Sequence, residues 1–434
     1  MTQPKQTKIP EDWEVVKLGD VILDIGDGGT PFTKIKEYFS GKIPWVNIED
    51  IKRDIYDTRR HLSESGLKNS SAKLWPEGTI IFSFGASIGK VGIARVKLCT
   101  KQGIAGIVPN SSKIDSEFLY YVLVRESEKI KKIGQSMGST IREVRPSKLV
   151  KLIIFGLPPL PEQKAIAQIL STVDKAIQKV DEIIAKTERL KKGLMQKLLT
   201  KGIGHKEFKD TEIGRIPKEW EVIKLNEITT KIKDIDHKMP KKEEIGVPFV
   251  SIKCMLKYPD LNFCLDSNDP DLEFISKEDY EYHAQRFNVE RGDIIYSRFG
   301  SIGNAKLVMT DQPFIASYSI VLIKPDRRKV DSIFLTCVLN SERVRKQAKS
   351  ATKGATNRNL HLEDIKNFRI PLPPIQEQQK IAEILSTIDK KLELERKRKE
   401  KLEKIKKGLM NDLLTGRKRV NVEKVLALGG ENES

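Results

Sequence analysis

The chain has 434 residues, of which 38% are hydrophobic and 32% charged, a composition typical of a folded protein with room for two domains and not of a disordered one. Lys and Arg outnumber Asp and Glu by 78 to 60, and the resulting net charge of +18 favours a polyanionic partner. No segment approaches the roughly 20 apolar residues that span a bilayer, and the N-terminal segment lacks the apolar stretch of a signal peptide. We therefore expect a cytoplasmic protein without a membrane partner.

Most of the first half of the sequence returns in the second half, about 210 residues later. The segment from Ile9 to Leu18 is repeated from Ile216 to Leu225, with Ile-Pro-x-x-Trp-Glu in both. A Ser-Ile-Gly triplet is also present twice, at 87–89 and 301–303. These matches predict two copies of one domain.

Each copy is predicted to combine strands with helices. In the first copy, the apolar run Thr79–Ser83 follows a glycine and predicts a strand, and Ser116–Lys132 predicts a helix. In the second copy, Ile320–Ile323 predicts a strand and Ser332–Ala348 a helix. The expected fold class is α+β.

A long helix is predicted after each copy. Pro158 and Pro159 disfavour helix before Leu160, while Pro161 can occupy a first helical turn. The two helices, at 161–200 and 376–415, match at a constant offset, whereas the offset drifts within the globules. The helices are therefore expected to be constrained in length.

A coiled-coil seam of apolar residues is predicted along both helices. Because a compact second globule joins the end of the first helix to the start of the second, we expect antiparallel pairing, with one globule at each end and an approximate twofold axis. The predicted boundaries are 1–156 and 204–371 for the globules, 157–203 and 372–416 for the helices, and 417–434 for a tail. The predicted seam consists of Ile166, Ile169, Val173, Val180, Ile183, Leu190, Leu194, Ile381, Ile384, Ile388, Leu402, Ile405 and Leu409.

No catalytic or metal site is predicted. The segment from Gly85 to Lys90 is one residue short of a phosphate-binding loop and lacks its Ser or Thr, so a tight turn after a strand is the better interpretation. Asp326 and Asp364 could be fitted to a nuclease-like pattern, but no third carboxylate accompanies them. The 5 histidines and 4 cysteines are too scattered for a triad or a metal cluster.

The positive charge indicates that the globules are the nucleic-acid surface. The two helices carry eight basic with five acidic and eleven basic with eight acidic residues, so they supply +6 of the +18. Base reading requires Arg, Lys, Asn or Ser on loops that can reach a groove, and three groups of loops in each copy offer them. The candidate DNA-binding residues are Thr30, Lys34, Lys36, Ser83, Ser87, Lys90, Ser139, Thr140, Arg142, Lys241, Lys242, Ser297, Arg298, Ser301, Asn304, Asn357, Arg358 and Asn359.

From Ile9 to about Gly416, these motifs resemble the specificity subunit of a type I restriction-modification system. The resemblance rests on the paired Ile-Pro-x-x-Trp-Glu segments, Gly-Thr-Pro at 29–31, the twin Ser-Ile-Gly turns and the two Leu-Pro-Pro-x-x-Glu-Gln helix starts. It implies a non-catalytic subunit in which each globule is a target recognition domain that binds one half of a bipartite site on double-stranded DNA. It also implies two modification subunits that use S-adenosylmethionine, and restriction subunits. The second globule lacks Gly-Thr-Pro and has Asn304 in place of Lys90, which suggests different half-sites.

Two other hypotheses remain open at this point. The chain could be a self-contained DNA methyltransferase or nuclease, which the motif search opposes. Alternatively, it could be a basic coiled-coil scaffold without sequence preference.

Overall fold

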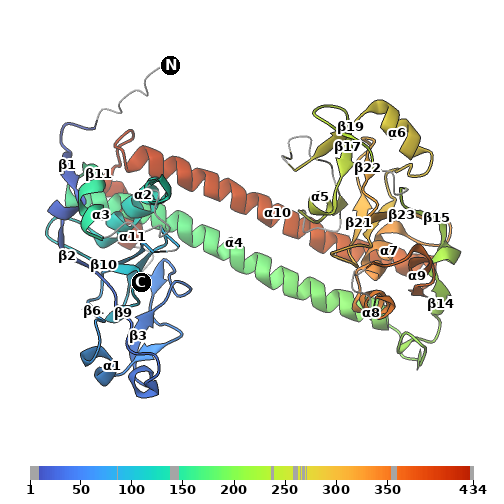
Figure 1. Cartoon of the computed structure of the whole chain (residues 1–434), viewed down its shortest axis with the longest axis horizontal. Coiled ribbons are helices and arrows are strands. Elements are labelled where there is room, and N and C mark those ends of the chain that lie inside the picture. The colour runs from blue at the N-terminus through green and yellow to red at the C-terminus, as the bar shows by residue number, and fades with distance from the viewer. Residues whose placement is uncertain are drawn as a thin grey trace. The chain divides into compact units, whose positions relative to one another are not determined.

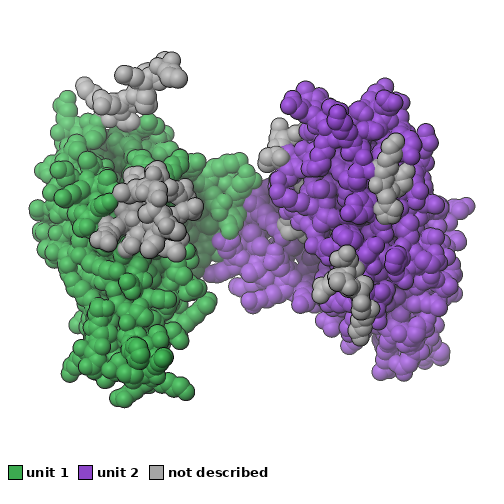
Figure 2. All heavy atoms as spheres, in the orientation of Figure 1, with its two compact units in different colours: residues 1–179, 399–434 green, residues 180–398 purple. Residues whose placement is uncertain are grey.

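The computed structural model describes residues 9–85, 87–136, 146–235, 239–257, 262, 263, 265, 269, 271–352 and 359–430. Contacts divide the chain into two compact units, which Figure 2 colours separately. Unit 1 comprises residues 1–179 and 399–434, and unit 2 comprises residues 180–398. Each unit therefore holds one globule and one half of each long helix.

A five-stranded sheet forms the centre of unit 1, with the order β2-β10-β7-β8-β4. Neighbouring strands are antiparallel except for β4, which runs parallel to β8. All residues of β7 and β8 are buried, so they form continuous apolar runs in the sequence. The strands are β2 (Ile22–Asp27), β4 (Asp54–Ile55), β7 (Ile80–Ser83), β8 (Val91–Ala94) and β10 (Ile104–Pro109).

A smaller four-stranded sheet extends unit 1, with the order β5-β3-β9-β6. It carries the short helices η2 (Lys36–Phe39) and α1 (Glu64–Lys68). A separate strand pair, β1 (Glu14–Lys17) with β11 (Ile154–Leu157), brings the first strand of the unit beside the last one before the long helix. The small sheet consists of β3 (Ile43–Val46), β5 (His61–Leu62), β6 (Leu74–Trp75) and β9 (Leu98–Thr100), and η1 (Leu18–Asp20) follows β1.

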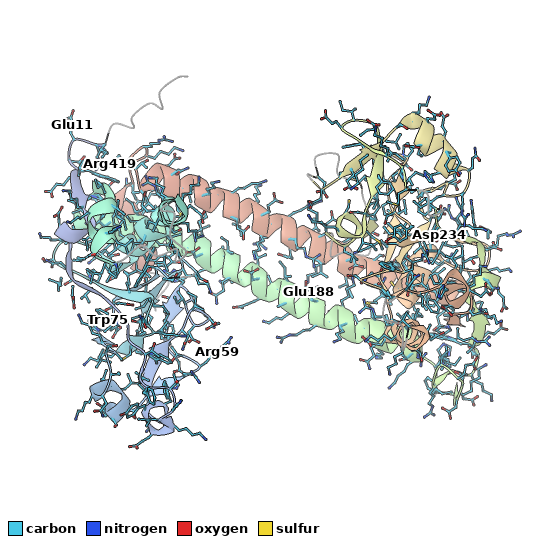
Figure 3. The ribbon with its side chains drawn as sticks, viewed as in Figure 1. Glu11, Arg59, Trp75, Glu188, Asp234 and Arg419 are labelled. Carbon is cyan, nitrogen blue, oxygen red and sulfur yellow. The ribbon has the colours of Figure 1, made fainter. Side chains whose placement is uncertain are left out.

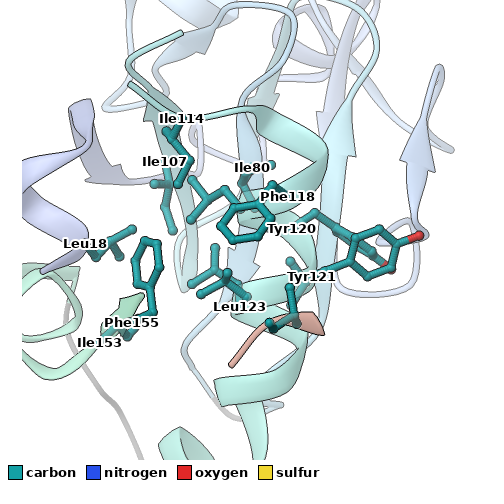
Figure 4. Packing of buried hydrophobic residues seen from close by; sticks show 14 of the residues in the cluster. Leu18, Ile80, Ile107, Ile114, Phe118, Tyr120, Tyr121, Leu123, Ile153 and Phe155 are labelled. Carbon is teal, nitrogen blue, oxygen red and sulfur yellow. The ribbon is translucent and has the colours of Figure 1, made fainter. Parts of the chain in front are cut away.

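The main core of unit 1 lies between the large sheet and two helices, α2 (Ser116–Ser136) and α3 (Pro146–Leu152). In Figure 4, Phe118 and Leu123 of α2 lie beside Ile80 and Ile107 of the sheet. The same cluster includes Ile166 from the start of the first long helix and residues from the end of the second. The helix ends are therefore part of the domain core.

Unit 2 repeats the large sheet strand for strand, with the order β15-β23-β20-β21-β18. Its small sheet, β16-β19-β17-β22, shares three strands with that of unit 1, but the fourth differs, because β16 pairs with β19 whereas β6 of unit 1 pairs with β9 at the opposite edge. The parallel pairs also recur, β18 with β21 and β17 with β22. The predicted α+β fold with two repeated domains is thus confirmed. The strands are β14 (Glu221–Lys224), β15 (Thr229–Lys233), β16 (Lys242–Glu243), β17 (Val247–Val250), β18 (Asn262–Phe263), β19 (Glu273–Ile275), β20 (Ile294–Ser297), β21 (Ala305–Val308), β22 (Ile315–Ala316), β23 (Ile320–Pro325) and β24 (Arg369–Leu372), with the pair β12 (Phe208–Lys209) and β13 (Ile216–Pro217) before them.

The predicted helix Ser332–Ala348 is wrong in one respect, because it is broken in two. It consists of α7 (Ser332–Leu339) and α8 (Glu342–Ala351). The side chain of Asn340 donates to the carbonyls of Thr336 and Ala305, and Ser341 caps α8. The other helices of unit 2 are η3 (Leu225–Ile228), α5 (Ile252–Lys257), α6 (Lys277–Ala284) and α9 (Leu362–Lys366).

The long helices, α4 (Leu160–Lys201) and α10 (Ile375–Leu413), pair in opposite directions within each unit (Figure 1). In unit 1, the start of α4 meets the end of α10, where Lys406 Nζ lies 2.6 Å from Asp174 Oδ1. In unit 2, the end of α4 meets the start of α10 through the ion pair of Lys191 with Asp389. These pairs are repeats of each other, since Asp389 and Lys406 follow Asp174 and Lys191 at the constant helix offset. A short helix, α11 (Val422–Gly430), follows in unit 1.

The predicted seam needs a correction at three positions. Ile166, Val180 and Ile381 are buried as expected, but Leu190, Ile384 and Ile405 are 56%, 39% and 43% exposed. Leu170, Leu385 and Leu392 are buried instead. They lie four residues after Ile166, Ile381 and Ile388, so at these places the seam follows the four-residue step rather than the three-residue step. The remaining predicted positions are partly buried, namely Ile169, Val173, Ile183, Leu194, Ile388, Leu402 and Leu409.

No helix in the described part of the chain has the length and apolar character that crossing a membrane requires.

Candidate nucleic-acid interface

The twin Ser-Ile-Gly segments form the same turn in both units. In unit 1, the buried Ser83 hydroxyl donates to the Ser87 carbonyl at 2.5 Å and accepts from the Lys90 amide at 2.8 Å. In unit 2, Ser297 makes the equivalent bonds to Ser301 and Asn304 at 2.6 and 3.0 Å. Ser83 and Ser297 therefore hold the turn closed.

The third residue of each triplet explains why glycine is required there. Gly89 and Gly303 have φ angles of 95° and 90°, which glycine adopts without strain. The turn directs other residues outward, because Ser87 and Ser301 are exposed.

The residue that follows the turn differs between the units. In unit 1, the exposed Lys90 extends its ammonium to the Ile48 carbonyl at 2.8 Å, across to the loop after β3. In unit 2, Asn304 folds back onto its own turn and donates to the Ser301 carbonyl at 2.9 Å. Among the described residues of the two turns, the one in unit 1 therefore places a lysine beside the neighbouring loop and the one in unit 2 does not.

Arg298 does not fit the predicted role in base reading, because its side chain is only 7% exposed. Its Nη2 lies 2.8 Å from the carboxylate of Asp234, and its Nε donates to the Tyr318 carbonyl at 2.9 Å. Asp234, which Figure 3 labels in unit 2, is itself 5% exposed. A buried cation needs such a partner, so Arg298 stabilises the turn from the interior of the domain.

The second candidate group is brought next to the turn in unit 2. Asn359 forms a β-bridge with Phe299, and its Oδ1 accepts from Arg298 at 3.4 Å. The other members of this group, Ser139, Thr140, Arg142, Asn357 and Arg358, lie outside the described residues.

The third group lies mainly on exposed loops. In unit 1, Lys34 and Lys36 are exposed and Thr30 is half-buried. In unit 2, Lys241 and Lys242 are exposed, and Lys242 pairs with Glu273 at 2.6 Å. Because these lysines are solvated, phosphate contact is the role that their placement allows.

The aromatic residues near these loops belong to the core. Trp45 and Phe249 are 1% and 2% exposed, and the Trp45 indole donates to the Gly29 carbonyl at 3.0 Å. A Cβ at Gly29 would lie 2.2 Å from the Ala72 backbone, so this loop requires glycine to pack.

Sequence reasoning missed one exposed group in unit 1, the loop that joins β4 to β5. Tyr56 is 66% exposed, and the side chain of Arg59 is 77% exposed. An aromatic residue and the adjacent Arg59–Arg60 pair within one short polar segment were the available signal.

The described residues offer little chemistry of other kinds. Among them, no group of three or more His, Cys, Asp or Glu is placed to hold a metal ion. Cys99, Cys254 and Cys337 are buried, and burial raises the pKa of these thiols to about 12, 11 and 12. Such thiols remain protonated at neutral pH and behave as small apolar residues.

Together, these observations define a class: a duplicated α+β protein whose two domains share one frame and carry different surface residues. A family model described as the type I restriction modification DNA specificity domain matches residues 10–189 and 217–404. The chain therefore belongs to the type I restriction-modification specificity subunits, which are the non-catalytic DNA-recognition components of these systems.

Similar proteins support this assignment over nearly the whole chain. The MjaVIII specificity subunit of Methanocaldococcus jannaschii is 32% identical, over 95% of this chain and 94% of its own length. The MjaIX specificity subunit of the same organism is 31% identical, over 96% and 97%. The crystal structure of the S subunit from M. genitalium has the same fold, with a TM-score of 0.58, 19% identity, and coverage of 95% of this chain and 98% of that one.

Proposed function

We propose that this chain recognises a bipartite site on double-stranded DNA, one half-site per domain, and directs partner methyltransferase and restriction subunits to it. The observation that carries the proposal is the repetition of one fold with different residues at the same surface positions, such as Lys90 and Asn304. Two domains that read the same sequence would not need different surfaces.

The charge distribution supports DNA as the ligand. The long helices account for +6 of the net +18, so the domains carry most of the excess. Exposed lysines near the turns, such as Lys34 and Lys241, are suited to phosphate contacts, which supply affinity without sequence information.

The partners and cofactor follow from the family. We propose two modification subunits per chain, one for each domain, with S-adenosylmethionine bound to those subunits and not to this chain. Restriction subunits would complete the complex, which would act on DNA in the cytoplasm.

The experiment is to enrich random duplexes on the chain assembled with its modification subunits. We expect two short defined sequences separated by an undefined spacer of constant length. Enrichment without sequence preference would indicate the scaffold hypothesis, and S-adenosylmethionine turnover or DNA cleavage by the chain alone would indicate the enzyme hypothesis.

A further inference from the structure

The loop Tyr56–Arg60 of unit 1 exposes an arginine and a tyrosine, and its backbone is fixed by hydrogen bonds to the interior of the domain. We propose that this loop contacts bases of one half-site, with Arg59 reading a base edge in the major groove and Tyr56 packing beside it. The proposal rests on the proposed function, since it assigns residues to DNA recognition by the first domain.

The backbone of the loop is fixed by Thr58, which is 8% exposed. Its hydroxyl accepts from the Trp45 amide at 2.9 Å and donates to the Arg60 carbonyl at 2.6 Å. The Trp45 amide also donates to the Arg60 carbonyl at 3.0 Å. Since Trp45 is a core residue, the loop is tied directly to the interior of the domain.

Asp50 holds Arg59 from one side. This carboxylate is 7% exposed and accepts from the Asn47 amide at 2.9 Å and the Arg59 amide at 3.3 Å. It also lies 3.9 Å from Arg59 Nε, and the Arg59 side chain is 77% exposed, so the guanidinium is held near one end and remains open to solvent. Figure 3 shows Arg59 extending from the surface of unit 1.

The rest of the loop is held as well. Asp57 pairs with His61 at 2.7 Å, and the guanidinium of Arg60 lies 5.5 Å from the Phe39 ring. Tyr56 is left projecting, and an exposed tyrosine on a fixed loop can contact a partner with little loss of conformational freedom. Held loops of this kind lower the entropic cost of binding.

The chemistry of the exposed groups favours duplex DNA. The two Nη donors of an arginine match the O6 and N7 acceptors of guanine, and the Nη atoms of Arg59 have no hydrogen-bond partner in the described part of the chain. Lys90 reaches the same 47–50 turn through the Ile48 carbonyl, which adds a cation beside the loop for a phosphate. Arg298 differs in both respects, because it is buried and paired.

The test uses the full chain assembled with its modification subunits and the site that the wild-type complex enriches from random duplexes. Arg59→Ala should bind that site about 10- to 100-fold more weakly and lose preference at one or two adjacent base pairs of one half-site. Arg59→Lys, which keeps the charge, should retain binding to unrelated duplexes but not restore that base preference. Tyr56→Ala should weaken the same half-site by a smaller factor.

Controls separate folding and positioning from base contact. Lys68→Ala removes an exposed charge at the end of α1 and should leave the base preference unchanged. Asp50→Asn tests a positioning residue and should relax the same base pairs as Arg59→Ala, with thermal unfolding measured in parallel. Equal loss on all duplexes, rescue by Arg59→Lys or an unchanged preference would overturn the proposal. A wild-type complex that enriches no sequence would refute the proposed function instead.

Discussion

The two units are alike where each globule meets the long helices. Trp13 donates its indole N–H to Glu162 at 3.1 Å, and Trp220 donates to Glu377 at 3.0 Å. The next residue, Gln163 or its repeat, accepts from a backbone amide and donates to two carbonyls in the same way in each unit. The repeated Trp, Glu and Gln residues therefore make the same contact between the long helix and the domain in each unit. We call this contact the clamp.

The units differ on the surfaces that surround this clamp. On the edge strand of the large sheet, Asp24 of unit 1 occupies the position of Lys231 in unit 2. Asp24 pairs with Lys73, whereas burial and the like charges of Lys324 and Lys233 lower the pKa of Lys231. The comparison shows that the two units keep the same contacts between domain and helix but carry different charges at equivalent surface positions. Recognition of two different half-sites requires such a difference.

The clamp predicts the largest effect of substitution. Trp220→Ala should destabilise unit 2 by about 3–5 kcal/mol, because a fully buried aromatic side chain leaves a cavity and its hydrogen bond to Glu377 is lost. Trp13→Ala should have a similar effect on unit 1. Hydrogen exchange measured for each unit separately checks both, and a cost below about 1 kcal/mol for either would show that the repeated contacts are not equivalent.

The buried ion pair of Arg298 with Asp234 predicts the next largest loss of stability, and this loss is expected in unit 2 alone. Arg298→Met should cost about 3 kcal/mol, because Asp234 is then left buried without its main partner. Phe84 occupies the equivalent position in unit 1, so the fold accommodates an apolar side chain at this position. Adding Asp234→Asn should recover most of the loss in urea unfolding, and no recovery would mean that Arg298 acts elsewhere.

Much of the fold could be predicted because it depends on local patterns and on repetition. The paired motifs predict two α+β domains, and the prolines before Leu160 locate the start of a helix. The exact seam could not be predicted, because the residues at the three-residue and the four-residue step are both apolar, as with Ile169 and Leu170 or Ile384 and Leu385. Which of the two is buried depends on the contacts that the partner helix makes, and these are a tertiary property.

The site was harder to predict because exposure is a tertiary property. Arg298 and Arg59 are both arginines in loops, but Asp234 lies 64 positions before the first, and nothing local indicates that they meet. Arg59 is exposed because Thr58 and Asp50 hold its loop, and those bonds depend on how β3 is placed.

The ion pairs between the long helices predict a smaller loss of stability, and this loss should differ between the two units. In unit 1, Asp174 binds Lys406, accepts from the Tyr121 hydroxyl at 2.8 Å and lies 3.7 Å from Arg53. Asp174→Asn should therefore cost about 2 kcal/mol, more than Lys406→Met, which leaves the other two contacts in place. In unit 2, Cys337 occupies the position of Tyr121, so the same network cannot form. A double-mutant cycle between Asp174 and Tyr121 measures the difference, and zero coupling would contradict it.

Lengthening both long helices should change stability the least, and it should change the spacing between the two half-sites. The pairs Asp174–Lys406 and Lys191–Asp389 lie on either side of Ala185 and Glu400, so inserting four residues after each of these two positions preserves both pairs. Each helix lengthens by about 6 Å, and the extra four residues form a stutter that coiled coils tolerate.

If the helices set the distance between half-sites, the enriched spacer should grow by one or two base pairs while both half-sites keep their sequences, since duplex DNA rises about 3.4 Å per base pair. Insertion in one helix alone is the matched control, because it places the two ion pairs in conflict and should impair folding or binding. An unchanged spacer in the doubly lengthened protein would mean that α4 and α10 serve only as packing elements. The repeated clamp would then hold the domains without measuring the DNA between them.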